Sequence, residues 1–313
     1  MKRRIPWYLI PLAVLWVAGL LLAASGCRRG GSSNRGDGAA PAPRSQEVPG
    51  RRSGEAAGDR SGEAAGDRSG ESSASEPLYV RALLSAYPET LRGYKRGRLY
   101  FRGGGSICCD DGRGKSPQER LDEADVEDMF HEVYRRGDLF VPAYGEDPGR
   151  VRCDAFFRKM YGASKKQVRR HLVKVEWFGQ SIPFTTVNHA ADSLKAVQAD
   201  ILANAPHRVD YFRQSSSFYW RPVRGARRMS AHSYGIAIDL CTEYAHFWQW
   251  SHPDKGESDE LTYENALPED IVKIFEKHGF ISGTKWYHYD TMHFEFRPEL
   301  LLYASLLPGA PEP

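Results

Sequence analysis

Two short stretches of the chain carry metal-binding and proton-transferring residue types at regular spacing. In 230–240, residues from Ile236 onward alternate between two faces, as in a half-buried strand, and Asp239 falls on the open face. His232 lies seven residues before Asp239, and Gly235 allows a sharp turn that brings the imidazole back over the strand. The pattern predicts that a His and an Asp lie together.

A second alternating strand is expected at 292–296, with His293 at the start of its polar face. Two His and one carboxylate, with a fourth position left for water, form a ligand set suited to a catalytic zinc ion. Asp290 is a candidate general base. In a straight strand Asp290 and His293 would face opposite sides, so this hypothesis requires a bend near Thr291.

The two stretches read S-x-H-x-x-G-x-A-x-D at 230–239 and W-x-x-x-D-x-x-H-F-E at 286–295. This combination resembles the zinc D-alanyl-D-alanine carboxypeptidase family, which includes VanY-like enzymes and L-alanyl-D-glutamate endopeptidases. The resemblance implies a general base at Asp290. It implies that the zinc ligands are His232, Asp239 and His293.

The resemblance also implies roles for side chains around these ligands. Arg221 matches the arginine that the family places ahead of its first ligand, where it would stabilise the oxyanion or hold a substrate carboxylate. Ser230 is expected to contact substrate, and Trp286 to form a pocket wall or part of the core. Glu295 is either a partner that orients a ligand or a surface carboxylate. Where the family often has Trp-Gly-Gly, this chain has Ser-Gly-Thr at 282–284, a departure on the substrate side of the site.

The expected reaction is hydrolysis of D-amino-acid peptide bonds in peptidoglycan stem peptides, with a D-Ala-D-Ala carboxypeptidase as the first hypothesis. A peptidoglycan L,D- or D,D-endopeptidase would differ only in which bond is cut. A catalytically inactive wall-binding lipoprotein is a further alternative. A non-heme iron oxygenase also uses two His and one carboxylate, but typically with His-x-Asp spacing.

The first 27 residues have the layout of a bacterial export signal. Lys2-Arg3-Arg4 precedes an apolar run, which ends at Ser25-Gly26-Cys27 and resembles a lipobox. We expect a lipid anchor on Cys27 and a protein that faces the periplasm or cell wall. An uncleaved membrane anchor is the alternative, because about 20 apolar residues can span a bilayer.

Composition divides the rest of the chain into three parts. Residues 28–76 have no aromatic residue and carry a repeated octad, at 53–60 and 61–68, and are expected to form a disordered tether. Residues 77–172 are expected to form an N-terminal helical extension, and 173–313 the zinc peptidase domain.

Alternating segments near Val173, Ile182, Ser216, Ile236 and Met292, interleaved with helical patterns, predict an α+β fold. The fold would be a small antiparallel sheet with helices packed on one side. A capping box at 116–119 predicts a helix that continues in some form to about 135. Asn188 is expected to cap another helix.

The 313-residue chain has a net charge of +3, too small to indicate a nucleic-acid partner, and a monomer is expected. A loop with Arg224, Arg227 and Arg228 either is solvated or lines the entrance for substrate carboxylates. His246 and His252 are expected to be ordinary loop residues. Absence of C-x-x-C spacing argues against a zinc cluster; a disulfide from Cys108 or Cys109 to Cys153 is one option, and Cys241 is expected to be a buried thiol.

Overall fold

The computed structural model describes residues 76–309. The export signal predicted at 1–27 and, apart from Glu76, the tether predicted at 28–76 lie outside this range. Within it, no helix is both long and apolar enough to cross a membrane.

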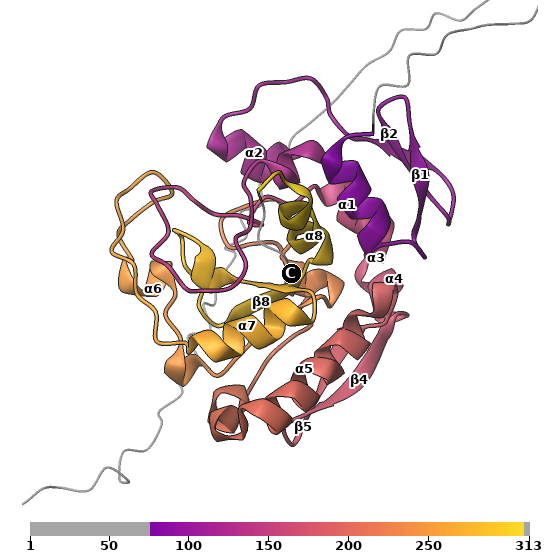
Figure 1. The fold of residues 1–313 in the computed structure, drawn as a ribbon. Helices are drawn as coiled ribbons and strands as arrows, with labels where there is room; N and C mark the ends of the chain where they lie inside the picture. The colour runs from indigo at the N-terminus through magenta and orange to yellow at the C-terminus, as the bar shows by residue number, and fades with distance from the viewer. Residues whose placement is uncertain (1–75, 310–313) are drawn as a thin grey trace, which may run out of the picture. The chain divides into compact units, whose positions relative to one another are not determined.

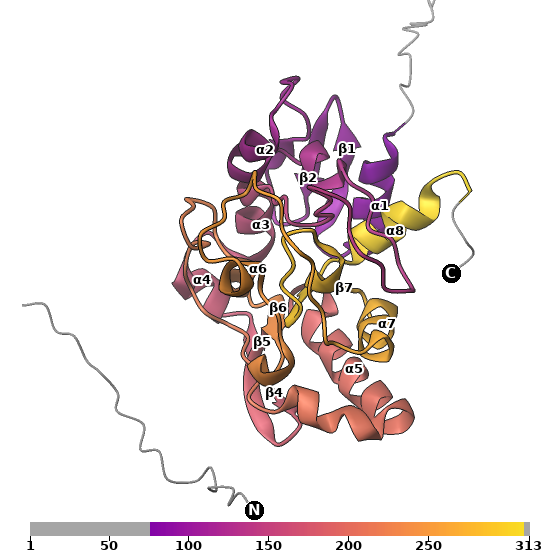
Figure 2. The ribbon, with the colours of Figure 1, turned by 90° about the vertical axis from the view of Figure 1, so that its left-hand side faces the viewer.

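The described part is a mixture of helices and small antiparallel sheets (Figure 1), which confirms the predicted α+β class. The strands form three separate sheets where a single small sheet was expected. Figure 2 shows the N-terminal elements at one end, the β4–β5 hairpin with α5 at the other, and the strands β6 and β7 between them.

The segment 77–172 contains a three-stranded sheet as well as the expected helices. The helices are α1 (Leu78–Ala86), α2 (Pro117–Glu123), α3 (Asp154–Tyr161) and α4 (Lys165–Arg169), and the strands are β1 (Leu91–Lys95), β2 (Arg98–Phe101) and β3 (Ser106–Cys108). The expected helices are therefore present, and the three-stranded sheet beside them was not predicted. The sheet escaped prediction because a bulge between Leu91 and Gly93 breaks the alternation of β1, and because β3 is very short.

Helix α2 begins where the capping box predicts. The Ser116 hydroxyl accepts the Glu119 N–H, and the Glu119 carboxylate accepts the Ser116 N–H. The helix ends at Glu123, well before residue 135, because the following acidic residues turn back to a buried lysine. The Lys115 ammonium lies 2.9 Å from Asp125 and 2.6 Å from Asp128.

The expected hairpin is present as β4 (Leu172–Trp177) and β5 (Gln180–Thr185), followed by α5 (Ala190–Asn204). Asn188 does not cap α5. Its backbone is left-handed, with a φ of 55°, and its side chain accepts a hydrogen bond from Thr90 instead. The helix therefore starts without a side-chain cap at His189.

The two motif strands are neighbours in one sheet of order β6–β8–β7, formed by β6 (Ala237–Asp239), β8 (His293–Phe296) and β7 (Phe280–Ser282). Its register pairs Asp239 directly with His293. The strand expected from Ser216 is reduced to a single bridge between Ser216 and Asp239. The remaining helices are α6 (Trp248–Ser251), α7 (Glu269–Lys277) and α8 (Pro298–Leu306).

One hydrophobic core cluster includes residues from both 77–172 and 173–313. Helix α7 packs Phe275 face to face on Phe294 of β8, with ring centroids 3.9 Å apart. Buried polar contacts tie the N-terminal segment to this layer: the Tyr134 hydroxyl donates to Glu276 of α7 and accepts the N–H of Ser282. The segment before 173 is thus built into the layers that hold the motif strands.

Gly149 brings the N-terminal segment close to the sheet, and its replacement by Ala is expected to destabilise the fold. Its φ is 95°, and a Cβ would lie 2.4 Å from Ile281 Cδ1 and 3.1 Å from Leu300 Cδ1. Overpacking of this kind costs about 1–3 kcal/mol, added to about 1 kcal/mol of left-handed strain. Gly145→Ala is the control, because Gly145 has a φ of 69° but no atom within 4 Å of its Cβ position. Urea denaturation should show a larger loss of unfolding free energy for Gly149→Ala, and equal losses would contradict the packing argument.

Candidate active site

A turn and two strand ends bring the three candidate metal ligands together. His232 lies on a short 3-10 helix, Ala231–Tyr234, which ends at Gly235 with a φ of 68°. That left-handed glycine reverses the chain into β6, as the spacing predicted. Asp239 is the last residue of β6, and His293, its partner in the register, is the first of β8.

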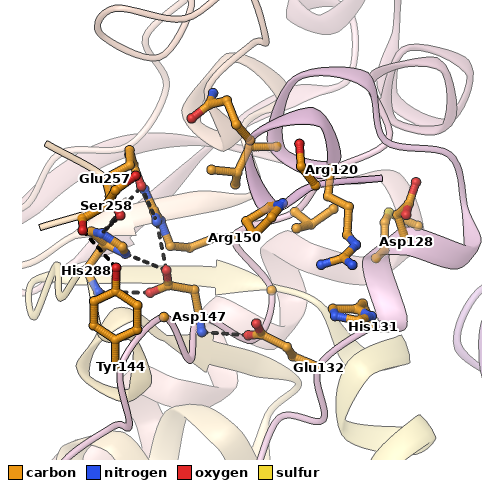
Figure 3. A pocket seen from close by; sticks show the side chains of 18 residues that line it. Arg120, Asp128, His131, Glu132, Tyr144, Asp147, Arg150, Glu257, Ser258 and His288 are labelled. Atoms are coloured by element: carbon orange, nitrogen blue, oxygen red, sulfur yellow. Dashed lines mark hydrogen bonds and ion pairs between the residues drawn. The ribbon is translucent and has the colours of Figure 1, made fainter. Parts of the chain in front are cut away.

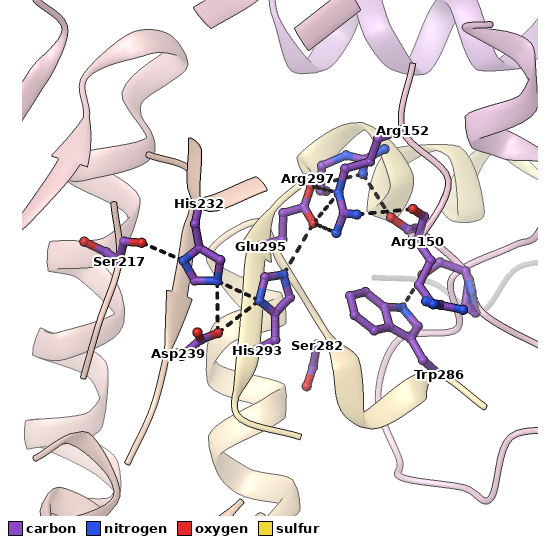
Figure 4. A network of polar contacts seen from close by, with 12 residues as sticks. Arg150, Arg152, Ser217, His232, Asp239, Ser282, Trp286, His293, Glu295 and Arg297 are labelled. Carbon is purple, nitrogen blue, oxygen red and sulfur yellow. Dashed lines mark hydrogen bonds and ion pairs between the residues drawn. The ribbon is translucent and has the colours of Figure 1, made fainter. Parts of the chain in front are cut away.

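The ligand atoms form a nearly equilateral triangle (Figure 4). His232 Nε2 lies 3.1 Å from Asp239 Oδ1 and 3.2 Å from His293 Nδ1. His293 Nδ1 lies 3.1 Å from Asp239 Oδ1. In the described residues, these three side chains form one of the groups able to hold a metal ion.

This triangle fits a tetrahedral metal ion. Ligand bonds of about 2.0–2.1 Å at tetrahedral angles place neighbouring donors about 3.3 Å apart, close to the observed separations. Two neutral imidazoles and one carboxylate leave a fourth position for water or substrate. The donor set therefore suits a catalytic metal centre better than a closed structural one.

Each histidine has a polar group near its far nitrogen. His232 Nδ1 lies 2.6 Å from the carbonyl oxygen of Ser217, which fixes the tautomer that leaves Nε2 free for a metal. His293 Nε2 lies 3.6 Å from Glu295 Oε2, just beyond hydrogen-bonding distance. The alternative of a surface carboxylate for Glu295 is wrong, since the side chain is fully buried.

Two buried arginines hold Glu295 in place. Arg152 donates from Nε to both carboxylate oxygens at 3.0 Å and from Nη2 to Oε2 at 2.5 Å. Arg297 Nη1 donates to Oε1 at 3.3 Å. Neither arginine was predicted: Arg152 lies 143 residues from Glu295 and no local pattern marks it, whereas Arg297 follows Glu295 by two residues and the alternation of β8 could have indicated it.

The charges around His293 favour a cation. Burial alone would lower the pKa of His293, but its contacts with Asp239 and Glu295 outweigh that effect and raise the pKa to about 9. Burial raises the pKa of Asp239, yet the two imidazoles outweigh it and hold that pKa below its usual range. The two carboxylates that keep a proton on His293 can equally stabilise a metal cation beside it.

Asp290 has the features expected of a proton acceptor beside this centre. The required bend is present, as a turn at Thr291–Met292 in which the His293 N–H donates to the Asp290 carbonyl at 3.0 Å. Within residues 76–309, the buried Asp290 Oδ1 has no hydrogen-bond partner. Burial raises the pKa of Asp290 to about 6; the His293 charge opposes this shift and that of Asp239 adds to it.

Arg221 and Ser230 are placed beside the His232 turn. The Ser230 N–H donates to the Arg221 carbonyl, and the Ser233 hydroxyl binds both main-chain groups of Arg221. The Arg221 guanidinium is exposed and donates to the carbonyl of Pro222 at 3.4 Å. Contact of either residue with substrate stays a prediction.

Trp286 lies against the metal site as a buried wall. Its ring centroid is 5.6 Å from that of His293, and its Nε1 donates to the Pro148 carbonyl at 2.7 Å. The side chain packs between His293 and the N-terminal segment (Figure 4). Whether it also touches substrate stays a prediction.

The basic loop divides into two parts. Arg224 and Arg227 are at least partly exposed, but Arg228 is buried and donates to Asp122 of α2 at 2.9 Å. Arg228 is therefore neither a solvated loop residue nor a residue that lines the entrance for substrate carboxylates. His246 and His252 bind Glu264 and the Thr262 carbonyl, as expected of loop residues.

The cysteines of the described part are all free thiols. Cys241 is buried, as predicted. Neither Cys108 nor Cys109 forms the disulfide to Cys153 that was considered.

This arrangement suits a catalytic metal centre, and comparison with known proteins adds support for a peptidase. Residues 224–296 match a protein-family model described as D-alanyl-D-alanine carboxypeptidase. The match contains the three candidate ligands and Asp290, and it supports both the family that the motifs resemble and a peptidase class. Neither a curated protein nor a solved structure matches the chain.

Proposed function

We propose that the chain is a zinc peptidase that hydrolyses D-amino-acid peptide bonds of peptidoglycan stem peptides, with the terminal D-Ala-D-Ala bond as its first candidate substrate. One observation carries the proposal: a triangle of His232, Asp239 and His293 donors beside Asp290, whose Oδ1 is buried. All four residues fall within the family match.

The side chains divide the work of amide hydrolysis. His232, Asp239 and His293 would hold the zinc ion. Zinc, when bound, supplies a Lewis acid that polarises the scissile carbonyl and lowers the pKa of a bound water. Asp290 takes the proton of the attacking water and delivers it to the leaving amine.

Arg221 and Ser230 are the candidates for holding the substrate. The Ser233 hydroxyl binds the main chain of Arg221, and the Ser230 N–H donates to the Arg221 carbonyl, so both residues lie next to the His232 turn. The exposed Arg221 side chain would reach a substrate carboxylate or the developing oxyanion. Trp286 would form the wall of the substrate site next to His293.

The test is incubation of the zinc-loaded chain with defined muropeptides, read by mass spectrometry. Release of terminal D-Ala would support a carboxypeptidase, and internal cleavage an endopeptidase. Absence of any product from protein with bound zinc would overturn the peptidase and leave wall binding as the alternative. Iron in the purified protein with oxygen-dependent activity would also contradict it.

Gly283 is expected to be required for the position of Asp290. A Cβ on Gly283 would lie 2.3 Å from the Asp290 carbonyl oxygen, a main-chain atom that cannot rotate away. Gly283→Ala should therefore displace Asp290 and lower kcat/KM by about 100-fold, the usual result of a shift of about 1 Å at a reacting group. Gly103→Ala is the control, with no atom within 4 Å. Unchanged kcat/KM in a folded Gly283→Ala variant would contradict this dependence.

We also propose that the protein acts outside the cytoplasm, anchored through a lipid on Cys27. The basic start, the apolar run and the lipobox-like residues before Cys27 support this localisation. The composition of 28–76 suits a tether, which at about 49 residues would reach roughly 40 Å from the membrane. Cys27→Ser should abolish incorporation of radiolabelled fatty acid, and retained label would contradict the anchor.

A further inference from the structure

A cavity of about 390 Å³ is lined by His288, two residues before Asp290, but not by the candidate active-site residues themselves. Figure 3 shows the side chains that line it. It is enclosed by α2, by the segment around 128–132, by the loop 144–151 and by a wall that contains Glu257 and His288. No residue of the metal triad lines it, and neither does Asp290. Its volume is in the range that proteins use for small ligands.

One wall of the cavity is already saturated by its own ion pairs. Arg150 lies 2.9 Å from both Asp147 and Glu257, and His288 Nδ1 lies 2.6 Å from Asp147. Figure 3 shows these side chains joined in one network. This wall is therefore preorganised and offers a ligand little unpaired charge.

The opposite wall presents unpaired donors. The side chains of Arg120 and His131 both line the cavity, and among residues 76–309 neither makes a hydrogen bond or ion pair. Burial, together with the Arg120 charge, lowers the pKa of His131. Arg120 supplies a guanidinium fork, the geometry that binds carboxylates most specifically.

Glu132 carries a carboxyl group that no basic side chain of the described residues pairs with. Its Oε2 accepts the N–H of Asp147 at 2.6 Å, and within the described range no cation lies within ion-pair distance. Burial raises the pKa of this carboxyl to about 7. An ammonium group placed here would supply the missing positive charge.

We propose that this cavity binds an amino-acid head group, with its carboxylate on Arg120 and His131 and its ammonium on Glu132. The proposal rests on the proposed function, because a stem peptide that contains a diamino dicarboxylic acid ends one side chain in such a head group. The cavity adjoins the catalytic site: His288 precedes Asp290 by two residues, and the Arg150 charge acts on Asp290. The cavity would thereby distinguish substrates by the side chain of the residue near the scissile bond.

Isothermal titration of the full zinc-loaded chain with meso-diaminopimelate tests the site. Arg120→Gln and Glu132→Gln should each weaken binding at least 10-fold, while the exposed Arg213→Gln control should leave it unchanged. Pimelate, which lacks both ammonium groups, and 1,5-diaminopentane, which lacks both carboxylates, should bind at least 10-fold more weakly. Absence of binding at 10 mM probe, or equal affinity in all three variants, would overturn the proposal.

Hydrolysis assays separate this proposal from the proposed function. Arg120→Gln should raise KM for a stem peptide with diaminopimelate but not for one with lysine at the same position. Probe binding without hydrolysis of any muropeptide would overturn the peptidase and retain the cavity site. Hydrolysis without probe binding, and with equal KM values for the two peptides, would overturn the cavity site alone.

Discussion

Asp290→Asn is expected to lower kcat by about 100- to 10,000-fold while zinc remains bound. The substitution keeps the shape of the side chain and removes its ability to accept a proton, which is the contribution that general base catalysis supplies. Asp290 is not one of the three side chains of the ligand triangle, so metal content should stay at one ion per chain. The measurements are steady-state hydrolysis of a muropeptide and elemental analysis of the purified variant.

The same substitution should stabilise the metal-free protein. Burial raises the pKa of Asp290 from 3.8 to about 6. A raised carboxyl pKa favours folding at low pH, and this contribution is lost as the pH rises through the folded pKa. At pH 8 Asn should therefore raise the unfolding free energy by about 1–3 kcal/mol, with the difference vanishing below about pH 4. A variant that is inactive yet more stable cannot owe its inactivity to misfolding.

Asp192→Asn serves as the control for both the loss of kcat and the gain in unfolding free energy. Asp192 is an exposed residue of α5 paired with Lys195, so activity should remain within about twofold of wild type. If Asp290→Asn retained a tenth or more of the activity, Asp290 would not be the base. If it lost zinc, Asp290 would have to be assigned to the metal.

The motif strands were predictable because their information is local. The apolar positions of β8 alternate with His293 and Glu295, and this period of two separates the apolar face from the polar face, although both faces prove to be buried. Gly235 likewise marks the turn that returns His232 to Asp239, since its φ of 68° is one that glycine adopts without strain. The bend at Thr291 could be stated only as a requirement, because it depends on packing against the segment at His246.

What surrounds the site could not be predicted, because it depends on contacts between distant segments. Arg152 and Glu295 meet across 143 residues, and Tyr134 and Glu276 across 142. A buried arginine has the same sequence appearance as an exposed one, as the burial of Arg228 beside exposed Arg224 shows. The cavity has the same origin, because its walls come from segments that no single periodic pattern connects.

Arg152→Met is expected to weaken zinc binding by about 10- to 100-fold and to lower the unfolding free energy by about 3–5 kcal/mol. Arg152 donates three of the hydrogen bonds that hold the Glu295 carboxylate behind His293. Loss of an outer partner of a metal ligand typically has that effect on affinity, and removal of one half of a buried ion pair leaves an uncompensated charge. Zinc competition with a chromophoric chelator and urea denaturation measure the two effects.

The control is Arg158→Met, on α3 and close in sequence to Arg152. Arg158 pairs with Asp154 at the surface, with both side chains at least a third exposed, so its loss should change stability by less than about 1 kcal/mol and zinc affinity not at all. Equal effects of the two substitutions would mean that Arg152 acts only as a generic surface charge.

A double variant, Arg152→Met with Glu295→Gln, separates the role in folding from the role in metal binding. Removing both charges abolishes the unpaired buried carboxylate, so much of the stability lost in Arg152→Met should return. Zinc affinity should not return, because a neutral amide cannot replace the negative charge that Glu295 presents to His293 Nε2 at 3.6 Å. If affinity recovered together with stability, Arg152 would serve the fold alone. If affinity stayed low in a stable protein, metal binding would need the Glu295 charge that Arg152 holds in place, although Arg152 lies outside the region that matches the family.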